Sequence, residues 1–112
     1  MGTTTVDYIN IIQQLFRSYI EFLEDTEDLK LEPIFDRENN RYLLVEVGWQ
    51  GGRRIYGTLL HIDIINDKLW IQQDGTEEGV ANELVELGVP KHKIVLGFKS
   101  IDRRKITEYA VS

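Results

Sequence analysis

The sequence contains no cysteine and no long apolar run. Without cysteine the chain has no disulfide framework, no thiolate metal site and no cysteine nucleophile. No apolar stretch approaches the ~18 residues that a membrane-spanning helix needs. Because disulfides belong mostly to oxidising compartments, these absences lead us to expect a soluble, cytoplasmic protein that makes no contact with a membrane.

Familiar catalytic motifs are missing as well. The chain has no phosphate-binding P-loop, no dinucleotide fingerprint and no serine nucleophile elbow. It also lacks an Asp…Glu-x-Lys nuclease strand, because Asp63 is followed by Asn66-Asp67-Lys68 across a predicted turn. We therefore expect a protein that is not an enzyme, with no catalytic residue and no cofactor.

The formal net charge of −6 is distributed unevenly. Residues 1–49 hold ten acids and four bases, whereas residues 50–112 hold nine of each. A dedicated DNA-binding domain usually carries an excess of basic residues, because phosphate contacts supply most of its affinity. Autonomous DNA binding is therefore disfavoured, although a basic C-terminal stretch keeps it as an alternative. This stretch contains Lys91, Lys93, Lys99, Arg103, Arg104 and Lys105.

A chain of 112 residues forms a single domain, residues 1–112. Apolar residues recur at three- and four-residue steps over residues 5–24, which predicts one amphipathic helix packed on the core. The repeating positions are Val6, Ile9, Ile12, Leu15, Phe16, Tyr19, Ile20 and Leu23. The acidic stretch 24–30 is expected to form a solvated loop.

Strands and tight turns dominate the next forty residues. Residues 33–36 predict a short edge strand, because Pro33 cannot donate a main-chain hydrogen bond. Turns at 39–40, 50–52 and 66–67 separate predicted strands that begin at Arg41, Arg54 and Lys68. Gly57 suggests a bulge in the second of these strands. Three consecutive hairpins predict a four-stranded antiparallel meander.

A second helix is expected after Asp74. Asp74 is a candidate N-cap, with Glu77 reaching back to the cap nitrogen, and Gly88 ends the helix. Residues 94–98 form a predicted short strand, and residues 99–112 are polar and expected to be extended or partly ordered. The predicted fold is α+β: an antiparallel meander sheet of four to five strands, with the N-terminal helix and the second helix packed on one face.

Two tryptophans are placed by strand alternation. One face of the strand that begins at Arg41 carries Leu43, Val45, Val47 and Trp49. We predict that this apolar face forms the core and that Trp49 is buried. Trp70 is predicted on the opposite, open face, which an antiparallel sheet leaves available. Together with Tyr56 it is a candidate partner contact. Self-association through this face into a homo-oligomer is a hypothesis.

A candidate polar cluster contains His61, Asp63, Asp74 and Glu77. His61 and Asp63 lie two residues apart, so their side chains share one face of a strand. With Asp74 or Glu77 as a third ligand they could bind a divalent cation in a metal-dependent hydrolase. A hydrogen-bonded structural pair is the simpler interpretation, and we predict no metal site.

Basic side chains are the other candidate contacts. Arg53 and Arg54 follow a predicted hairpin turn, and a second group lies near the C-terminus. The second group is Lys99, Arg103, Arg104 and Lys105. Both groups could bind an acidic partner surface or phosphates. Solvated charges on loops are the plainer interpretation.

Several segments, taken in order, resemble the XisI family of fdxN element excision controlling factors. The segments are Tyr8 to Gln14, Phe35-Asp36-x-Glu38, Arg41 to Leu44, Val47-Gly48-Trp49, Gly57 to Ile65 with His61-Ile62-Asp63-Ile64, Trp70 to Glu77, and Ile94 to Phe98 with Tyr109-Ala110. Their order and spacing cover nearly the whole chain. One departure is Lys99-Ser100-Ile101, where the family pattern has a proline-containing turn.

The resemblance implies an accessory role in programmed, site-specific DNA excision, alongside a large serine recombinase and a second small factor, XisH, which resembles nuclease-fold proteins. It brings no established catalytic residues with it. We therefore expect a non-catalytic controlling factor that acts through protein–protein contact with an XisH-like factor, so that any role of nucleic acid is indirect. The alternative is an accessory protein that binds DNA directly through Arg53, Arg54 and the basic C-terminal segment.

Overall fold

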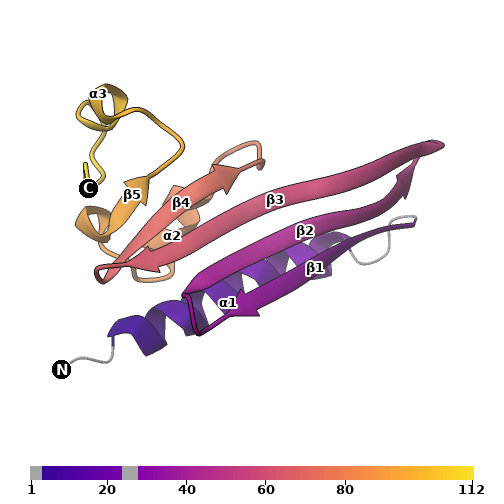
Figure 1. Cartoon of the computed structure of the whole chain (residues 1–112), viewed down its shortest axis with the longest axis horizontal. Helices are drawn as coiled ribbons and strands as arrows, with labels where there is room; N and C mark the ends of the chain where they lie inside the picture. The colour runs from indigo at the N-terminus through magenta and orange to yellow at the C-terminus, as the bar shows by residue number, and fades with distance from the viewer. Residues whose placement is uncertain (1–3, 24–27) are drawn as a thin grey trace.

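The computed structural model describes residues 4–23 and 28–112. Figure 1 shows a twisted sheet with helices behind it. The elements in chain order are α1 (Thr4–Leu23), β1 (Asp28–Asp36), β2 (Arg41–Gln50), β3 (Arg53–Ile65), β4 (Lys68–Asp74), α2 (Val80–Glu86), a 3-10 turn (Lys91–Lys93), β5 (Ile94–Leu96) and α3 (Ile101–Arg104). None of the described helices is long and apolar enough to cross a membrane.

The sheet has the strand order β1-β2-β3-β4-β5. The first four strands form the predicted antiparallel meander, and the α+β fold is confirmed. The fifth strand differs from a meander because it runs parallel to β4. This direction follows from the connection, since α2 carries the chain back along the sheet before β5 begins.

Two-residue turns with positive φ join the central strands. Gly51 and Gly52 have φ angles of 58° and 79°, and Asn66 and Asp67 have φ angles of 50° and 65°. Turns of this hand match the right-handed twist of the flanking strands, and glycine, asparagine and aspartate adopt them at least cost. The hairpin turns predicted at these positions are therefore confirmed.

Helices α1 and α2 both lie behind the sheet in Figure 1 and pack against one side of it. We call this side the inner face and the opposite side the outer face. Fully buried inner-face residues are Tyr42, Leu44, Leu60, Ile62, Leu69, Ile71 and Ile94. They meet a helical layer whose buried residues include Ile12, Leu15, Phe16, Val80 and Leu84. The periodicity that predicted the first helix therefore marks its core-facing side.

Strand β1 is longer than predicted. It begins at Asp28 rather than Pro33 and pairs with β2 along its whole length. Residues 28–30 of the predicted acidic loop therefore belong to a strand, while residues 24–27 lie outside the described chain. The long partner strand provides the template for this extension. The predicted edge position is correct, since β1 pairs only with β2 among the described strands.

A bulge was predicted at Gly57 of β3, but the observed register irregularity lies two residues further along this strand. Leu44 pairs with Leu60 and Val45 with Thr58, so the additional residue on β3 is Leu59. A second irregularity lies between His61 and Ile62 on the β4 side of β3. Gly57 itself pairs regularly.

The predicted capping box at Asp74 is wrong in detail. α2 begins at Val80, and Glu77 is an exposed residue of the preceding turn. Asp74 still caps the helix from a distance: its Oδ2 accepts from the Val80 main-chain nitrogen at 2.8 Å. Its Oδ1 accepts from the Thr76 nitrogen at 3.0 Å and from the Thr76 hydroxyl at 2.6 Å. β4 extends to Asp74, and residues 75–79 connect it to the helix.

The C-terminal segment is partly ordered, one of the two states predicted for it. Strand β5 ends at Leu96 rather than Phe98, and α3 follows. The Ala110 main-chain nitrogen then donates to the Ile94 carbonyl at 2.8 Å, beside a parallel bridge between Val95 and Ala110. The segment therefore covers the outer edge of β5.

Candidate protein-docking surface

The outer face of β1, β2 and β3 carries a group of partly exposed apolar side chains. In an antiparallel sheet, paired residues project to the same side. Ile34 pairs with Leu43, and Val47 pairs with Tyr56. The outer-face patch consists of Ile34, Leu43, Val45, Val47, Trp49 and Tyr56. Among the described helices, α1 and α2 lie on the other side of the sheet (Figure 1).

The prediction that Trp49 is a core residue is wrong. Trp49 is 50% exposed, whereas Tyr42 and Leu44, on the opposite face of the same strand, are fully buried. The alternation of residues along β2 was predicted correctly, but the core face and the exposed face were assigned the wrong way round. The outer side of β2 is the more apolar one, because Glu46 follows Tyr42 and Leu44 on the inner side. The position of the helices nevertheless makes the inner side the core.

Polar side chains surround this patch. Lys30 and Glu32 of β1 pair with Val47 and Val45, and so project to the same side. The Arg54 guanidinium lies 5.4 Å from the centre of the Trp49 ring. Tyr56 is the most exposed member of the patch, at 75%. An apolar centre with a polar rim is the usual composition of a protein–protein interface.

The structure divides the predicted polar cluster. His61 Nε2 lies 2.8 Å from Asp63 Oδ1, and the Gln72 amide donates to Asp63 Oδ2 at 3.3 Å. Asp74 pairs with Leu60, so it projects to the inner face, where it caps α2. Within residues 4–23 and 28–112, no three His, Asp or Glu side chains lie close enough to hold a metal ion. His61 and Asp63 form a hydrogen-bonded pair on the outer face.

Trp70 lies on the outer face, as predicted, but the C-terminal segment partly covers it. Its partner Asp63 projects to the outer side, and the Arg104 guanidinium lies 5.2 Å from the Trp70 ring centre. Arg104 also donates to four main-chain carbonyls, those of Leu96 (3.2 Å), Lys99 (2.9 Å), Val111 (3.1 Å) and Gly97 (3.4 Å). Arg104 therefore holds the C-terminal segment against the sheet rather than facing a ligand.

The remaining basic candidates do not form one surface. Arg53 and Arg54 lie near the tip of the β2–β3 hairpin, at the opposite end of the molecule from α3 (Figure 1). Near the C-terminus, the Lys99 ammonium lies 5.5 Å from the Phe98 ring centre. Arg103 and Lys105 are exposed.

Two lysines of the basic stretch pair with carboxylates. Lys91 donates to Glu108 at 2.6 Å, and this hydrogen bond raises the pKa of the Lys91 ammonium. Lys93 donates to Asp67 at 3.2 Å. The positive charge of the stretch is therefore partly neutralised within the molecule.

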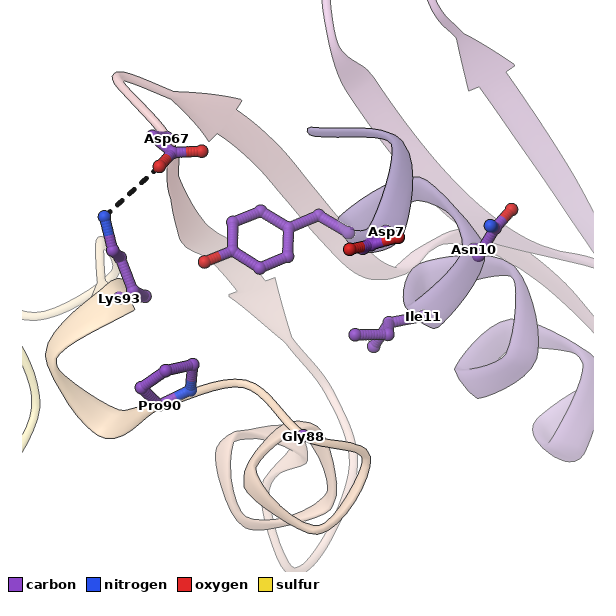
Figure 2. A pocket seen from close by; sticks show the side chains of 8 residues that line it. Asp7, Asn10, Ile11, Asp67, Gly88, Pro90 and Lys93 are labelled. Atoms are coloured by element: carbon purple, nitrogen blue, oxygen red, sulfur yellow. Dashed lines mark hydrogen bonds and ion pairs between the residues drawn. The ribbon is translucent and has the colours of Figure 1, made fainter. Parts of the chain in front are cut away.

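A hollow of about 640 Å³ lies between α1, the β3–β4 turn and the connection from α2 to β5. Figure 2 shows Asp7, Asn10 and Ile11 on one side and Pro90 and the Asp67–Lys93 ion pair on the other. Tyr8 also lines it, and burial, assisted by the charge of Asp67, raises the pKa of its phenol. Lys93, the described cation that lines the hollow, is already paired with Asp67, and Asp7 adds a negative charge. The hollow therefore does not favour an anion such as phosphate.

Comparison with known proteins identifies the family. The family model described as XisI protein matches residues 1–111. The chain belongs to the XisI family. It is similar to a crystal structure of an XisI-like protein from Anabaena variabilis, with 38% identity, a TM-score of 0.86, and coverage of 96% of this chain and 99% of that one. It is also similar to the fdxN element excision controlling factor XisI of the same organism, with 29% identity, a TM-score of 0.80, and coverage of 97% and 99%. No curated protein matches the chain.

Proposed function

We propose that this XisI family member is a non-catalytic controlling factor in programmed, site-specific DNA excision, and that it acts by docking another protein on its outer-face patch. The excision role rests on family membership and on the similar Anabaena variabilis protein named fdxN element excision controlling factor XisI. The partner suggested by the family resemblance is an XisH-like factor in the cytoplasm.

The outer-face patch is the observation that carries this proposal. Its central residues, Val45 and Val47, lie in the middle strand of three paired strands. A sheet holds such side chains in place before a partner arrives, so binding orders few of them and loses little conformational entropy. Scattered exposed apolar residues are ordinary, but a contiguous group with a polar rim favours an interaction site.

A non-catalytic role agrees with the arrangement of the polar side chains. The His61 and Asp63 side chains are bonded to one another, and Asp74 caps α2 on the opposite face. A general acid or base must reach a substrate atom within hydrogen-bonding distance, usually beside a second functional group. The two carboxylates and the imidazole do not converge on one such position.

Direct DNA binding has less support than protein docking. Arg104 is committed to main-chain carbonyls and to Trp70, and Arg53 and Arg54 lie at the far end of the molecule. A DNA-binding surface would instead place several free cations along one phosphate backbone.

The test is binding of a purified XisH-like protein to variants with altered patch charge. Ile34→Asp and Val47→Asp introduce carboxylates into the patch, and each is expected to weaken binding about tenfold or more. Phe22→Asp is the matched control, because Phe22 is 85% exposed on α1, away from the outer face. Isothermal titration calorimetry measures the affinities, and circular dichroism checks folding.

The same variants separate the two functions. Equal affinity of all three folded variants for the partner would exclude the outer-face patch as the docking surface. A gel shift on duplex DNA at low salt, lost in the charge-neutral variant of Arg53, Arg54, Arg103 and Lys105, would favour direct DNA binding.

A further inference from the structure

Half of β3 has an unpaired edge. β3 spans 13 residues and β4 only 7, and β4 pairs with β3 over Leu60–Ile65. Next to this segment, the Gly75 nitrogen donates to the Leu59 carbonyl at 2.8 Å. From Arg53 to Thr58, no described strand lies on the β4 side. Such an edge is a template for another strand.

The hairpin register shows which main-chain groups face outward. A two-residue turn is flanked by a hydrogen-bonded pair, here Gln50 and Arg53. Hydrogen-bonded and non-bonded pairs then alternate along an antiparallel ladder. The pairs at Arg54 and Tyr56 are therefore of the non-bonded kind, so the N–H and C=O groups of these two residues point away from β2.

The other two sheet edges are protected. β1 carries Pro33, which lacks an N–H, together with Lys30 and Glu32. Proline and charged residues are the usual means of blocking an edge. The outer edge of β5 is covered by the C-terminal segment, where Ala110 bonds to Ile94. The β3 edge carries Arg53 and Arg54 at one end, but in the described part of the chain it has neither a proline nor a covering segment.

Opposite charges mark the two ends of this edge. Arg53 and Arg54 lie at the end nearest the hairpin tip. Beyond Leu59, the turn that follows Gly75 carries the exposed residues Glu77 and Glu78. If two such edges meet in antiparallel orientation, the basic end of each faces the acidic end of the other.

We propose that a second copy of this chain pairs with the β3 edge, so that one sheet continues through a two-fold symmetric dimer. A symmetry axis at Ile55 sets Arg54 of each copy opposite Tyr56 of the other, and each pair exchanges two main-chain hydrogen bonds. No arginine faces an identical arginine in this register. The paired segment ends before Leu59, whose carbonyl is already used by Gly75. A two-fold interface of this kind is self-complementary and closed.

This inference goes beyond the docking function, because it uses the edge of the sheet rather than its outer face. In the dimer the two outer-face patches lie on one continuous sheet. A partner with two equivalent sites could therefore be held at both patches, which increases its effective affinity.

Sedimentation equilibrium of the full chain tests the dimer. We expect a mass of twice the 13.1 kDa of one chain at high concentration. The double reversal Arg53→Glu with Arg54→Glu, and the double reversal Glu77→Arg with Glu78→Arg, should each weaken self-association about tenfold or more. An equimolar mixture of the two variants should restore the dimer, because each then offers the charge that the other requires.

Main-chain pairing is tested at Tyr56. Tyr56→Pro removes an outward N–H and should abolish the dimer, whereas Tyr56→Thr retains the N–H and should weaken it less. Ile34→Ser, two strands away on the outer face, is the control and should leave the mass unchanged. A wild-type monomer at near-millimolar concentration overturns the proposal. So does a dimer that withstands Tyr56→Pro and both charge reversals in variants with native circular dichroism.

Discussion

Leu43 and Leu44 are adjacent, chemically identical and in the same strand, yet they belong to different environments. Leu44 is fully buried beneath α1 and α2, while Leu43 is partly exposed on the outer face. Along the rest of β2 the outer set continues with Val45, Val47 and Trp49, whereas the inner set continues with Glu46 and Gly48. An apolar side chain of this strand is therefore either part of the core or partly exposed, and the position of the helices decides which.

The two faces also differ in how they are stabilised. Close-packed apolar side chains stabilise the inner face, by about 25 cal/mol for each Å² of apolar surface removed from water. On the outer face near β4 and β5, the described contacts are made by a charged side chain: Arg104 lies over the Trp70 ring and donates to four main-chain carbonyls. The apolar part of the outer face has no described partner, so it contributes little to the stability of the monomer.

The largest expected effect comes from truncating the matched leucines. Leu44→Ala should lower the free energy of unfolding by about 3 kcal/mol, because it leaves a cavity among fully buried side chains. Leu43→Ala should cost less than about 1 kcal/mol, since its side chain is partly in water already. Urea unfolding followed by circular dichroism measures both. Equal losses would mean that the outer face is as tightly packed as the inner one.

An intermediate effect is expected for Arg104→Ala. The substitution removes the guanidinium from the Trp70 ring and takes one donor from each of four carbonyls, which should cost about 2 kcal/mol. The Leu96 carbonyl keeps its hydrogen bond from the Lys99 nitrogen. Arg104→Lys should recover little, because an ammonium cannot reproduce the planar arrangement of donors. The exposed neighbour Arg103 is the control. If Arg103→Ala destabilises as much in urea unfolding, the loss reflects net charge rather than these contacts.

The smallest effect concerns the contact between the two inner-face helices. The Tyr19 hydroxyl of α1 donates to Glu83 Oε2 of α2 at 2.5 Å. Tyr19→Phe should lower the free energy of unfolding by about 1 kcal/mol near neutral pH. Burial, reinforced by the bond to Glu83, raises the pKa of the Tyr19 phenol.

The raised pKa gives the Tyr19 contact a defined pH dependence. Below the ordinary phenol pKa of about 10, both folded and unfolded chains keep the proton, and the contribution is fully present. Above it, the unfolded chain ionises first, so the contribution is lost as pH rises toward the folded pKa. The stability difference between wild type and Tyr19→Phe should therefore stay constant up to about pH 9 and shrink as the pH rises above about 10. A difference that grows over this range would contradict the assigned bond.

Local sequence signals predicted the features that depend on neighbouring residues. The apolar periodicity of α1 and the positive-φ turns at Gly51-Gly52 and Asn66-Asp67 are properties of short segments. The same reasoning failed where a distant strand or helix intervenes. β1 begins five residues early because β2 offers it a partner, and α2 begins late because β4 continues to Asp74.

The candidate contact residues were predicted only in part. Tyr56 and Trp70 were correctly placed on the outer face, but Arg104, chosen as a free cation, covers Trp70 instead. Ile34 and Val47 were missed as contact candidates, since their apolar character equally suits a core. No local signal separates these two roles.

Local sequence patterns suffice to predict the alternation of β2, the hairpin turns and the amphipathic stripe of α1, because these depend on backbone preferences and on the period of apolar residues. Three features are visible only in the folded chain: the buried face of the sheet, the first residues of β1 and α2, and the unpaired part of the β3 edge. These features are set by the packing of segments distant in the chain, and an apolar side chain has the same identity whether it meets a helix or water.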